Sequence, residues 1–221
     1  MDDLTLVIPA KNEKESLPLV MQELKKYNLK TIIVLEESDY ETIESVNKFN
    51  CKILYQKNQG YGDALIEGIK SVETKFFCIF NADGSFKPSE LRNMYELSKH
   101  HNYDLVFASR YEKNSNSEDD TIITFLGNKI FTFLGKFFFS LPITDILYTY
   151  VLGQTLKTNQ LNLSYKDFCF CVELPIKAQR NKMSLISSPA SERKRFGGKK
   201  KVNAFKDGLK ILISMIVLKL N

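Results

Sequence analysis

The chain has 221 residues, of which 43% are hydrophobic, and a formal net charge of +5. This length fits one domain with a sizeable core. The four cysteines form no CxxC pair and have no spaced histidine partners, which argues against a disulfide framework and a zinc site and favours a reducing compartment.

Short β-branched or aromatic runs alternate with helical patterns in the first half of the chain. Strands are predicted at residues 4–8, 31–35, 52–55, 76–80 and 105–108, with amphipathic helices between them. This alternation is typical of a parallel sheet with crossover helices. Such sheets bind ligands beyond the carboxyl ends of their strands, so the polar segments that follow the strands form the candidate site.

Acidic side chains follow three of these strands. Asp83 comes after the apolar strand at residues 76–80 and is the leading candidate metal ligand. A carboxylate that faces a diphosphate there suits a hard cation such as Mg²⁺ or Mn²⁺, although an Asp-Gly turn without a metal remains the alternative. Glu13 and Glu36 end two other strands, where a carboxylate can accept hydrogen bonds from a nucleobase or ribose.

The segment NQGYGDA at residues 58–64 also follows a strand, and it opens a helix. Its glycines would permit close approach of the backbone to a nucleotide. The spacing is not GxGxxG, so a dinucleotide site is not predicted.

Two Phe- and Leu-rich segments in the second half are predicted to be helices. Residues 121–141 contain two lysines and two glycines, which favour an amphipathic helix over a membrane span. The apolar run within residues 204–220 is too short to span a bilayer. Membrane contact and burial against the protein remain open for both. Cys169 and Cys171 alternate with Phe and Val in a pattern that predicts a strand.

The basic run at residues 191–201 accounts for the whole net charge, because it holds six cationic side chains and one acid. Such a run is either a solvated face or a focused site for an anion. Composition alone leaves both interpretations open.

Taken in chain order, these segments resemble family 2 glycosyltransferases of the GT-A fold. The most similar branch is the dolichol-phosphate mannose synthase type, which uses polyprenyl phosphates. The segments that carry the similarity are IPAKNE at 8–13, residues 58–64, NADGS at 81–85, SRY at 109–111, Asp145, Glu173, and the run from Glu192 to Gly208.

The resemblance implies an α/β, Rossmann-like fold with a mainly parallel central sheet flanked by helices, plus C-terminal amphipathic helices. It implies a glycosyltransferase domain at residues 1–203, with a nucleotide-binding half at 1–110 and an acceptor-side half at 121–203. A C-terminal helix would follow at residues 204–221.

The resemblance also implies roles for individual residues. Asp83 would bind the metal, and Asp83, Asp145 and Arg110 would be catalytic. For an acceptor hydroxyl, Asp145 is the first candidate general base and Glu173 the second. Asn81 stands where the family usually has its first metal-site Asp. The nucleotide would be bound by Pro9, Ala10, Glu13, Glu36, Asn58, Gly62, Asn81, Ala82 and Asp83, and the acceptor or its phosphate by Arg110, Glu173, Arg193 and Lys199.

The expected activity is metal-dependent, inverting transfer of a sugar from a GDP- or UDP-linked donor to a polyprenyl phosphate or a membrane-associated glycan. The protein is expected in the cytoplasm, in peripheral contact with the inner face of the cell membrane, because its first residues lack the pattern of a secretory signal. One alternative is transfer to a saccharide hydroxyl in cell-surface polysaccharide synthesis. Another is a degenerate, non-catalytic protein that binds nucleotides or membranes. No nucleic-acid partner is expected.

Overall fold

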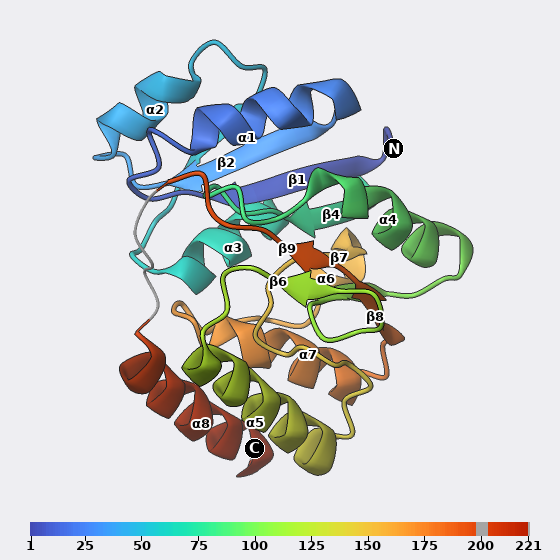
Figure 1. The fold of residues 1–221 in the computed structure, drawn as a ribbon. Coiled ribbons are helices and arrows are strands. Elements are labelled where there is room, and N and C mark those ends of the chain that lie inside the picture. Colours follow the sequence, from blue (N-terminus) through green and yellow to red (C-terminus); the bar gives the residue numbers. More distant parts are fainter. Residues whose placement is uncertain (198–202, 221) are drawn as a thin grey trace.

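A computed structural model describes residues 1–197 and 203–220, which form an α/β fold built in layers (Figure 1). The main sheet has seven strands in the order β3-β2-β1-β4-β7-β5-β8. Its strands are β1 (Leu4–Pro9), β2 (Lys30–Leu35), β3 (Lys52–Tyr55), β4 (Phe76–Ile79), β5 (Leu105–Ser109), β7 (Val151–Gln154) and β8 (Leu185–Pro189). A smaller sheet pairs β6 (Asn116–Ser117) with β9 (Ser191–Glu192).

The sheet is parallel except for one strand. β7 lies between β4 and β5 and runs antiparallel to both. The other strands therefore point the same way, and their carboxyl ends meet at one edge of the sheet. The prediction of a mainly parallel sheet is confirmed, whereas β7 and β8 were not predicted.

Two helical layers cover the sheet, because successive side chains of a strand point to opposite faces. Leu4, Leu6 and Ile8 of β1 belong to one core, whereas Val7 belongs to the other. The first core is covered by α1 (Leu17–Leu24), α2 (Tyr40–Val46) and α4 (Leu91–His100), with the 3₁₀ turns η1 (Lys25–Tyr27) and η2 (Pro88–Glu90) between them. The second is covered by α3 (Tyr61–Lys70) and α7 (Phe170–Arg180), and the short α6 (Thr155–Asn159) contacts α3.

A further layer is formed by α5 (Ile122–Phe139) and α8 (Ala204–Leu220), which contact each other and α7 (Figure 1). Both predicted helices are therefore present. Thr121 caps the start of α5, since its Oγ1 accepts a hydrogen bond from Thr124 N at 3.2 Å. Ser140, in the left-handed conformation with φ 54°, ends this helix.

The strand predicted around Cys169 and Cys171 is wrong, because Cys171 lies in α7 and Cys169 caps it. Helix α7 is buried on almost every side, and Phe170, Val172 and Ile176 are 0% exposed. A helix that is buried all round has no polar stripe, so over a few residues its sequence looks like a buried strand.

Candidate functional site

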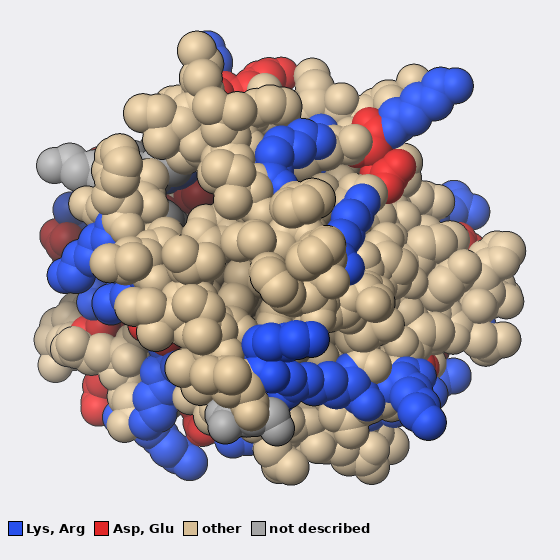
Figure 2. Space-filling view, turned by 90° about the horizontal axis from the view of Figure 1, so that it is seen from below, with Lys and Arg blue, Asp and Glu red and all other residues tan. Residues whose placement is uncertain are grey.

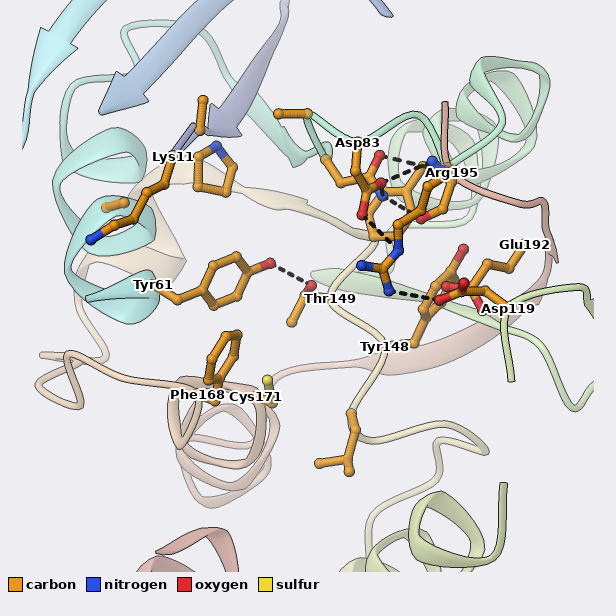
Figure 3. Close-up of a pocket in the computed structure, with 18 of the residues that line it drawn as sticks. Lys11, Tyr61, Asp83, Asp119, Tyr148, Thr149, Phe168, Cys171, Glu192 and Arg195 are labelled. Atoms are coloured by element: carbon orange, nitrogen blue, oxygen red, sulfur yellow. Dashed lines mark hydrogen bonds and ion pairs between the residues drawn. The ribbon is translucent and has the colours of Figure 1, made fainter. Parts of the chain in front are cut away.

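A cavity of about 610 Å³ opens at the carboxyl edge of the sheet (Figure 3). The segments that follow β1, β2, β4 and β5 all contribute to its wall, as the topology requires. Eight of the residues predicted from the sequence line it: Pro9, Ala10, Glu13, Glu36, Asn81, Ala82, Asp83 and Arg110.

The end of the cavity beside β1 and β2 is polar and already internally bonded. Lys11 Nζ lies 2.7 Å from Glu36 Oε1. Glu13 is 5% exposed and accepts a hydrogen bond from Ser16 Oγ at 2.5 Å. Carboxylates fixed in this way at a strand edge can accept hydrogen bonds from a ribose or a base.

The turn after β4 carries Asp83. Its Oδ1 accepts hydrogen bonds from Ser85 N at 2.9 Å and from Asn81 Nδ2 at 2.5 Å. Its Oδ2 lies 3.5 Å from Arg195 Nε. Gly84 forms this turn with φ 84°, in the left-handed region that favours glycine.

No group of three or more His, Cys, Asp or Glu side chains that could hold a metal occurs among residues 1–197 and 203–220. Asp83 has one carboxylate oxygen that is not used within the turn. Mg²⁺ and Mn²⁺ commonly take one or two carboxylates and complete their coordination with substrate phosphates. The site thus fits a cation shared with a bound diphosphate, and it offers too few carboxylates to bind one tightly without the diphosphate.

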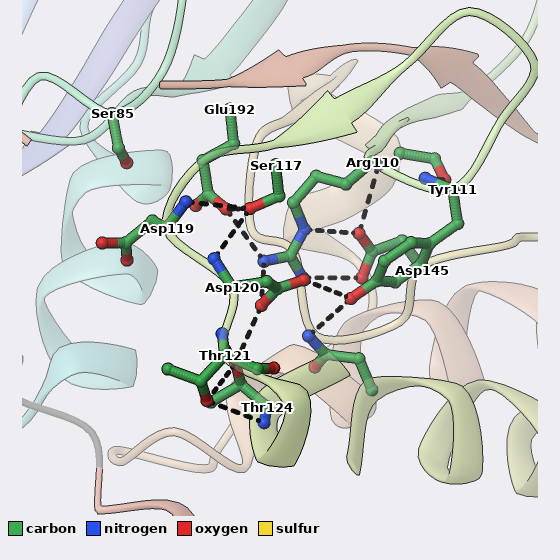
Figure 4. Close-up of polar contacts among 12 residues, drawn as sticks. Ser85, Arg110, Tyr111, Ser117, Asp119, Asp120, Thr121, Thr124, Asp145 and Glu192 are labelled. Atoms are coloured by element: carbon green, nitrogen blue, oxygen red, sulfur yellow. Dashed lines mark hydrogen bonds and ion pairs between the residues drawn. The ribbon is translucent and has the colours of Figure 1, made fainter. Parts of the chain in front are cut away.

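Arg110, from the end of β5, is surrounded by carboxylates (Figure 4). Its Nε and Nη2 donate to the two oxygens of Asp145 at 2.8 and 3.0 Å. Its Nη1 donates to Glu192 Oε2 at 3.1 Å and to Asp120 Oδ1 at 3.5 Å. Burial acts to lower the pKa of Arg110, but the neighbouring Asp145 outweighs it, and the pKa lies well above its ordinary value. The guanidinium is therefore a fixed charge at the cavity wall.

Asp145 lies behind Arg110 and is 0% exposed. It does not line the cavity. Burial raises its pKa, and the adjacent Arg110 opposes that rise. The prediction that Asp145 acts as a general base is corrected here, because a base must reach the proton that it removes. Its position suits holding Arg110 in place.

Glu192 of β9 lines the cavity, although it was predicted only as part of the family resemblance, without a role in the site. It accepts a hydrogen bond from Ser117 Oγ at 2.5 Å, because the pairing of β6 with β9 brings the two residues together. Burial raises the pKa of Glu192, although Arg110 opposes the effect. Asp119, Asp120 and Arg195 were missed too, although the acid-rich stretch EDD and the basic run were visible signals.

The opposite end of the cavity is more apolar. Tyr61 stacks on Phe168 with ring centroids 5.1 Å apart, and Tyr61 and Thr149 share a hydroxyl–hydroxyl hydrogen bond of 2.6 Å. Asn128 of α5 and Ile211 of α8 complete this wall. The cavity therefore extends from the strand ends to the α5/α8 layer.

Two predicted nucleotide residues lie outside the cavity lining. Asn58 donates from Nδ2 to Asp63 Oδ1 at 3.0 Å. A Cβ on Gly62 would lie 2.1 Å from the carbonyl oxygen of Tyr165. The glycine is thus required by the packing of another loop, which corrects the prediction that it serves the approach of a nucleotide.

Two predicted acceptor residues also lie elsewhere. Glu173 is 0% exposed and accepts hydrogen bonds from Ser164 N at 2.9 Å and Tyr165 N at 2.9 Å, so it holds a loop and does not face an acceptor. Arg193 pairs with Glu23 at 2.5 Å and does not line the cavity. Lys199 lies outside the described residues.

Residues 5–155 match the family model described as glycosyl transferase family 2. An uncharacterized protein of Methanocaldococcus jannaschii is 26% identical over 132 residues, which are 58% of this chain and 54% of that protein. An uncharacterized glycosyltransferase of Mycobacterium bovis is 29% identical over 110 residues, which are 49% of each chain. The chain thus spans about half the length of these curated relatives.

Solved structures share the fold at low sequence identity. Glucosyl-3-phosphoglycerate synthase from Mycobacterium tuberculosis, in complex with Mn²⁺, UDP and glucosyl-3-phosphoglycerate, has a TM-score of 0.77 at 11% identity, covering 97% of this chain and 79% of that one. Mannosyl-3-phosphoglycerate synthase from Rubrobacter xylanophilus has a TM-score of 0.70 at 12% identity, covering 97% and 72%. These likenesses confirm the predicted Rossmann-like GT-A fold.

Proposed function

Because this chain belongs to glycosyl transferase family 2 and is a glycosyltransferase, we propose that it transfers a sugar from a nucleoside diphosphate to a polyprenyl phosphate at a membrane surface. One observation carries the proposal. The cavity joins a polar end at the strand edge to an end lined by Tyr61, Phe168 and Ile211, to which α5 adds Thr124 and Asn128. Helices α5 and α8 also carry exposed apolar side chains. The proposed location is the inner face of the cytoplasmic membrane.

The donor would lie at the polar end. Pro9 and Ala10 line it with Glu13 and Glu36, whose carboxylates would accept hydrogen bonds from the nucleoside. The synthase from Mycobacterium tuberculosis was solved with Mn²⁺ and UDP, which supports a diphosphate and a divalent cation here. Asp83 would hold Mg²⁺ or Mn²⁺, which would neutralise charge on the leaving diphosphate.

The reaction would be a single displacement. An oxygen of the acceptor phosphate attacks the anomeric carbon from the face opposite the leaving group. The bond from that carbon to the diphosphate breaks, and the nucleoside diphosphate leaves with the electron pair, so the configuration inverts. A phosphate acceptor arrives already ionised and needs no general base, which agrees with the burial of Asp145.

The outer surface of α5 and α8 supports the proposal that the acceptor is a lipid phosphate. Phe133 and Phe137 of α5 are 62% and 69% exposed, and Phe205 of α8 is 79% exposed. Figure 2, seen from below, shows a face of mainly neutral side chains crossed by clusters of Lys and Arg. The lysines of the two helices are Lys129, Lys136, Lys206, Lys210 and Lys219.

Such a surface suits the membrane interface, where apolar side chains insert and lysines meet anionic head groups. Among the described helices, α5 has the length and composition that could cross a bilayer, with 17% of it buried. We propose that it lies in the interface, because Asn128 and Thr132 of the same helix are buried against the protein.

A second candidate acceptor is a hydroxyl of a small phosphorylated acid, as in the two phosphoglycerate synthases of similar fold. A hydroxyl needs a base. Glu192 is the observation that favours this candidate, since it lines the cavity and burial raises its pKa.

The donor is tested by a thermal-shift panel of UDP, GDP and CDP and their sugars, with and without Mn²⁺. We expect one nucleotide to raise the melting temperature only with the metal, and Asp83→Ala to abolish this rise. Turnover with polyprenyl phosphate, 3-phosphoglycerate or a saccharide then selects the acceptor. No response to any activated sugar, or full activity of Asp83→Ala, would end the proposal.

The membrane contact is tested by sedimentation with anionic phospholipid vesicles. Phe133→Ser combined with Phe137→Ser should weaken binding without lowering the melting temperature, because both side chains are exposed. Tyr40→Ser with Leu156→Ser is the matched control, since these side chains are 72% and 79% exposed on other helices. Equal binding by both double variants would contradict the proposed surface.

A further inference from the structure

The segment from Arg193 to Phe196 is held down on the turn that carries Asp83. Phe196 N donates to Asp83 O at 2.8 Å, and Arg193 N donates to Ser85 O at 3.1 Å. The ring of Phe196 covers Gly84 so closely that a Cβ there would lie 2.3 Å from its Cδ2. Arg195, between these anchors, is thereby directed at the cavity (Figure 3).

The guanidinium of Arg195 bridges two acids. Its Nη2 donates to Asp119 Oδ2 at 2.7 Å, and its Nε lies 3.5 Å from Asp83 Oδ2. This Nε is buried and has no hydrogen-bond partner among the described residues. A buried donor without a partner is unfavourable, so a ligand that brings a hydrogen-bond acceptor to this Nε would be stabilised by it.

Arg195 lies beside the carboxylate oxygen of Asp83 that a bound cation would use. Asp83 Oδ1 is used by Ser85 N and Asn81 Nδ2, and Oδ2 is the oxygen that faces Arg195. Asn81 adds an amide where a second carboxylate would help to hold a cation. A divalent ion and a guanidinium beside the same carboxylate repel each other, so one must leave before the other is well bound.

We propose that Arg195 occupies the cation position on Asp83 in the donor-free protein and gives it up when a nucleoside diphosphate binds. The diphosphate offers paired oxygens, which a guanidinium fork binds well, and the buried Nε gains a partner there. Asp83 is then released to the cation. Donor and cation consequently bind with positive coupling, and Arg195 is a positioning residue for the metal. This inference rests on the proposed function, since it requires a diphosphate donor and a metal at Asp83.

The test is the affinity for Mn²⁺, measured by electron paramagnetic resonance of the free ion, for the whole chain with and without UDP or GDP. The wild type should bind Mn²⁺ weakly alone and more tightly with the matching nucleotide, by a factor in the range of about 5 to 150. Arg195→Gln should bind Mn²⁺ alone at least about 5-fold more tightly than the wild type, with a smaller effect of nucleotide.

Two further variants separate the role of Arg195 from general effects of charge. Lys194→Gln removes the same charge from the adjacent, exposed position and should leave the affinity for Mn²⁺ unchanged. Arg195→Lys keeps a cation beside Asp83 and should bind Mn²⁺ alone as weakly as the wild type. Circular dichroism melts confirm that each variant is folded.

The outcomes are distinct. If Arg195→Gln binds Mn²⁺ alone no more tightly than the wild type, while nucleotide still promotes Mn²⁺ binding, the role of Arg195 is refuted and the proposed function stands. If no variant binds Mn²⁺ with any nucleoside diphosphate, both the proposed metal site and the role of Arg195 are refuted.

Discussion

Asparagine in place of Asp145 removes the carboxylate that holds Arg110 at two points. The guanidinium is 8% exposed, so little water can replace the lost oxygen, and the amide nitrogen of Asn would face one of the guanidinium N–H groups, donor against donor. Breaking a buried pair by removing one partner costs about 3–5 kcal/mol. Glu192 and Asp120 remain 3.1 and 3.5 Å from Arg110 Nη1 and still balance its charge. The expected cost of Asp145→Asn is therefore at the lower end of that range, about 3 kcal/mol.

In a chain of this size each kcal/mol lowers the melting temperature by about 2–4 °C, so Asp145→Asn should lower it by roughly 6–12 °C. Urea unfolding gives the free energy directly. The matched control is Asp2→Asn, which makes the same change on a fully exposed side chain and should leave the melting temperature unchanged. A cost below about 1 kcal/mol for the single variant would refute this account of the pair. Lost turnover at unchanged stability would show instead that Asp145 serves the reaction, directly or through Arg110.

Three other outcomes are expected. Glu173→Ala removes a buried carboxylate that accepts hydrogen bonds from Ser164 N and Tyr165 N, so it should cost about 2 kcal/mol in urea unfolding, while the thermal shift caused by the nucleotide stays the same. Gly84→Ala combines a positive φ with a clash against Phe196, so it should cost about 1–2 kcal/mol in urea unfolding and alter the affinity for Mn²⁺. Burial acts to raise the pKa of Asp104, but hydrogen bonds from Lys157 and Ser184 outweigh it, and the pKa falls below the ordinary value of 3.8. The stability that Asp104 contributes is present at neutral pH and is lost as the pH falls through the lowered pKa, so urea unfolding should show the wild type's advantage over Asp104→Asn shrinking as the pH falls below 3.8.

The strands predicted from the sequence are those whose own residues are sufficient to define them. Leu4, Leu6 and Ile8 alternate with Val7 between two cores, and this regular pattern is visible without the fold. β7 is a run of only four residues with Gly153 inside, and its place depends on Phe77 and Leu105, which contact it from distant parts of the chain. Such a strand exists because of its neighbours, and propensity alone cannot reveal it.

The candidate site was predictable to the extent that it follows from sheet geometry. Strand ends meet at one edge, so Glu13, Glu36 and Asp83 come together around the cavity. The sequence could not show which polar side chains face the cavity and which bond inside the protein. Glu173 and Asp145 were assigned to the site by motif alone, and both make internal contacts. The bridge from Arg195 to Asp83 joins positions more than 100 residues apart, and only the fold shows it.

The antiparallel strand β7 also has a consequence for the order of assembly during synthesis. β1 to β4 all precede residue 80 and are neighbours in the order β3-β2-β1-β4, so this half-sheet can form before the rest of the chain is made. β5 has no hydrogen-bonded neighbour in the main sheet until β7 is made at residues 151–154, because β7 alone links it to β4. Until then the open edge of β4 is exposed to pairing with other chains, and we expect nascent chains that end before residue 151 to aggregate more readily than longer ones.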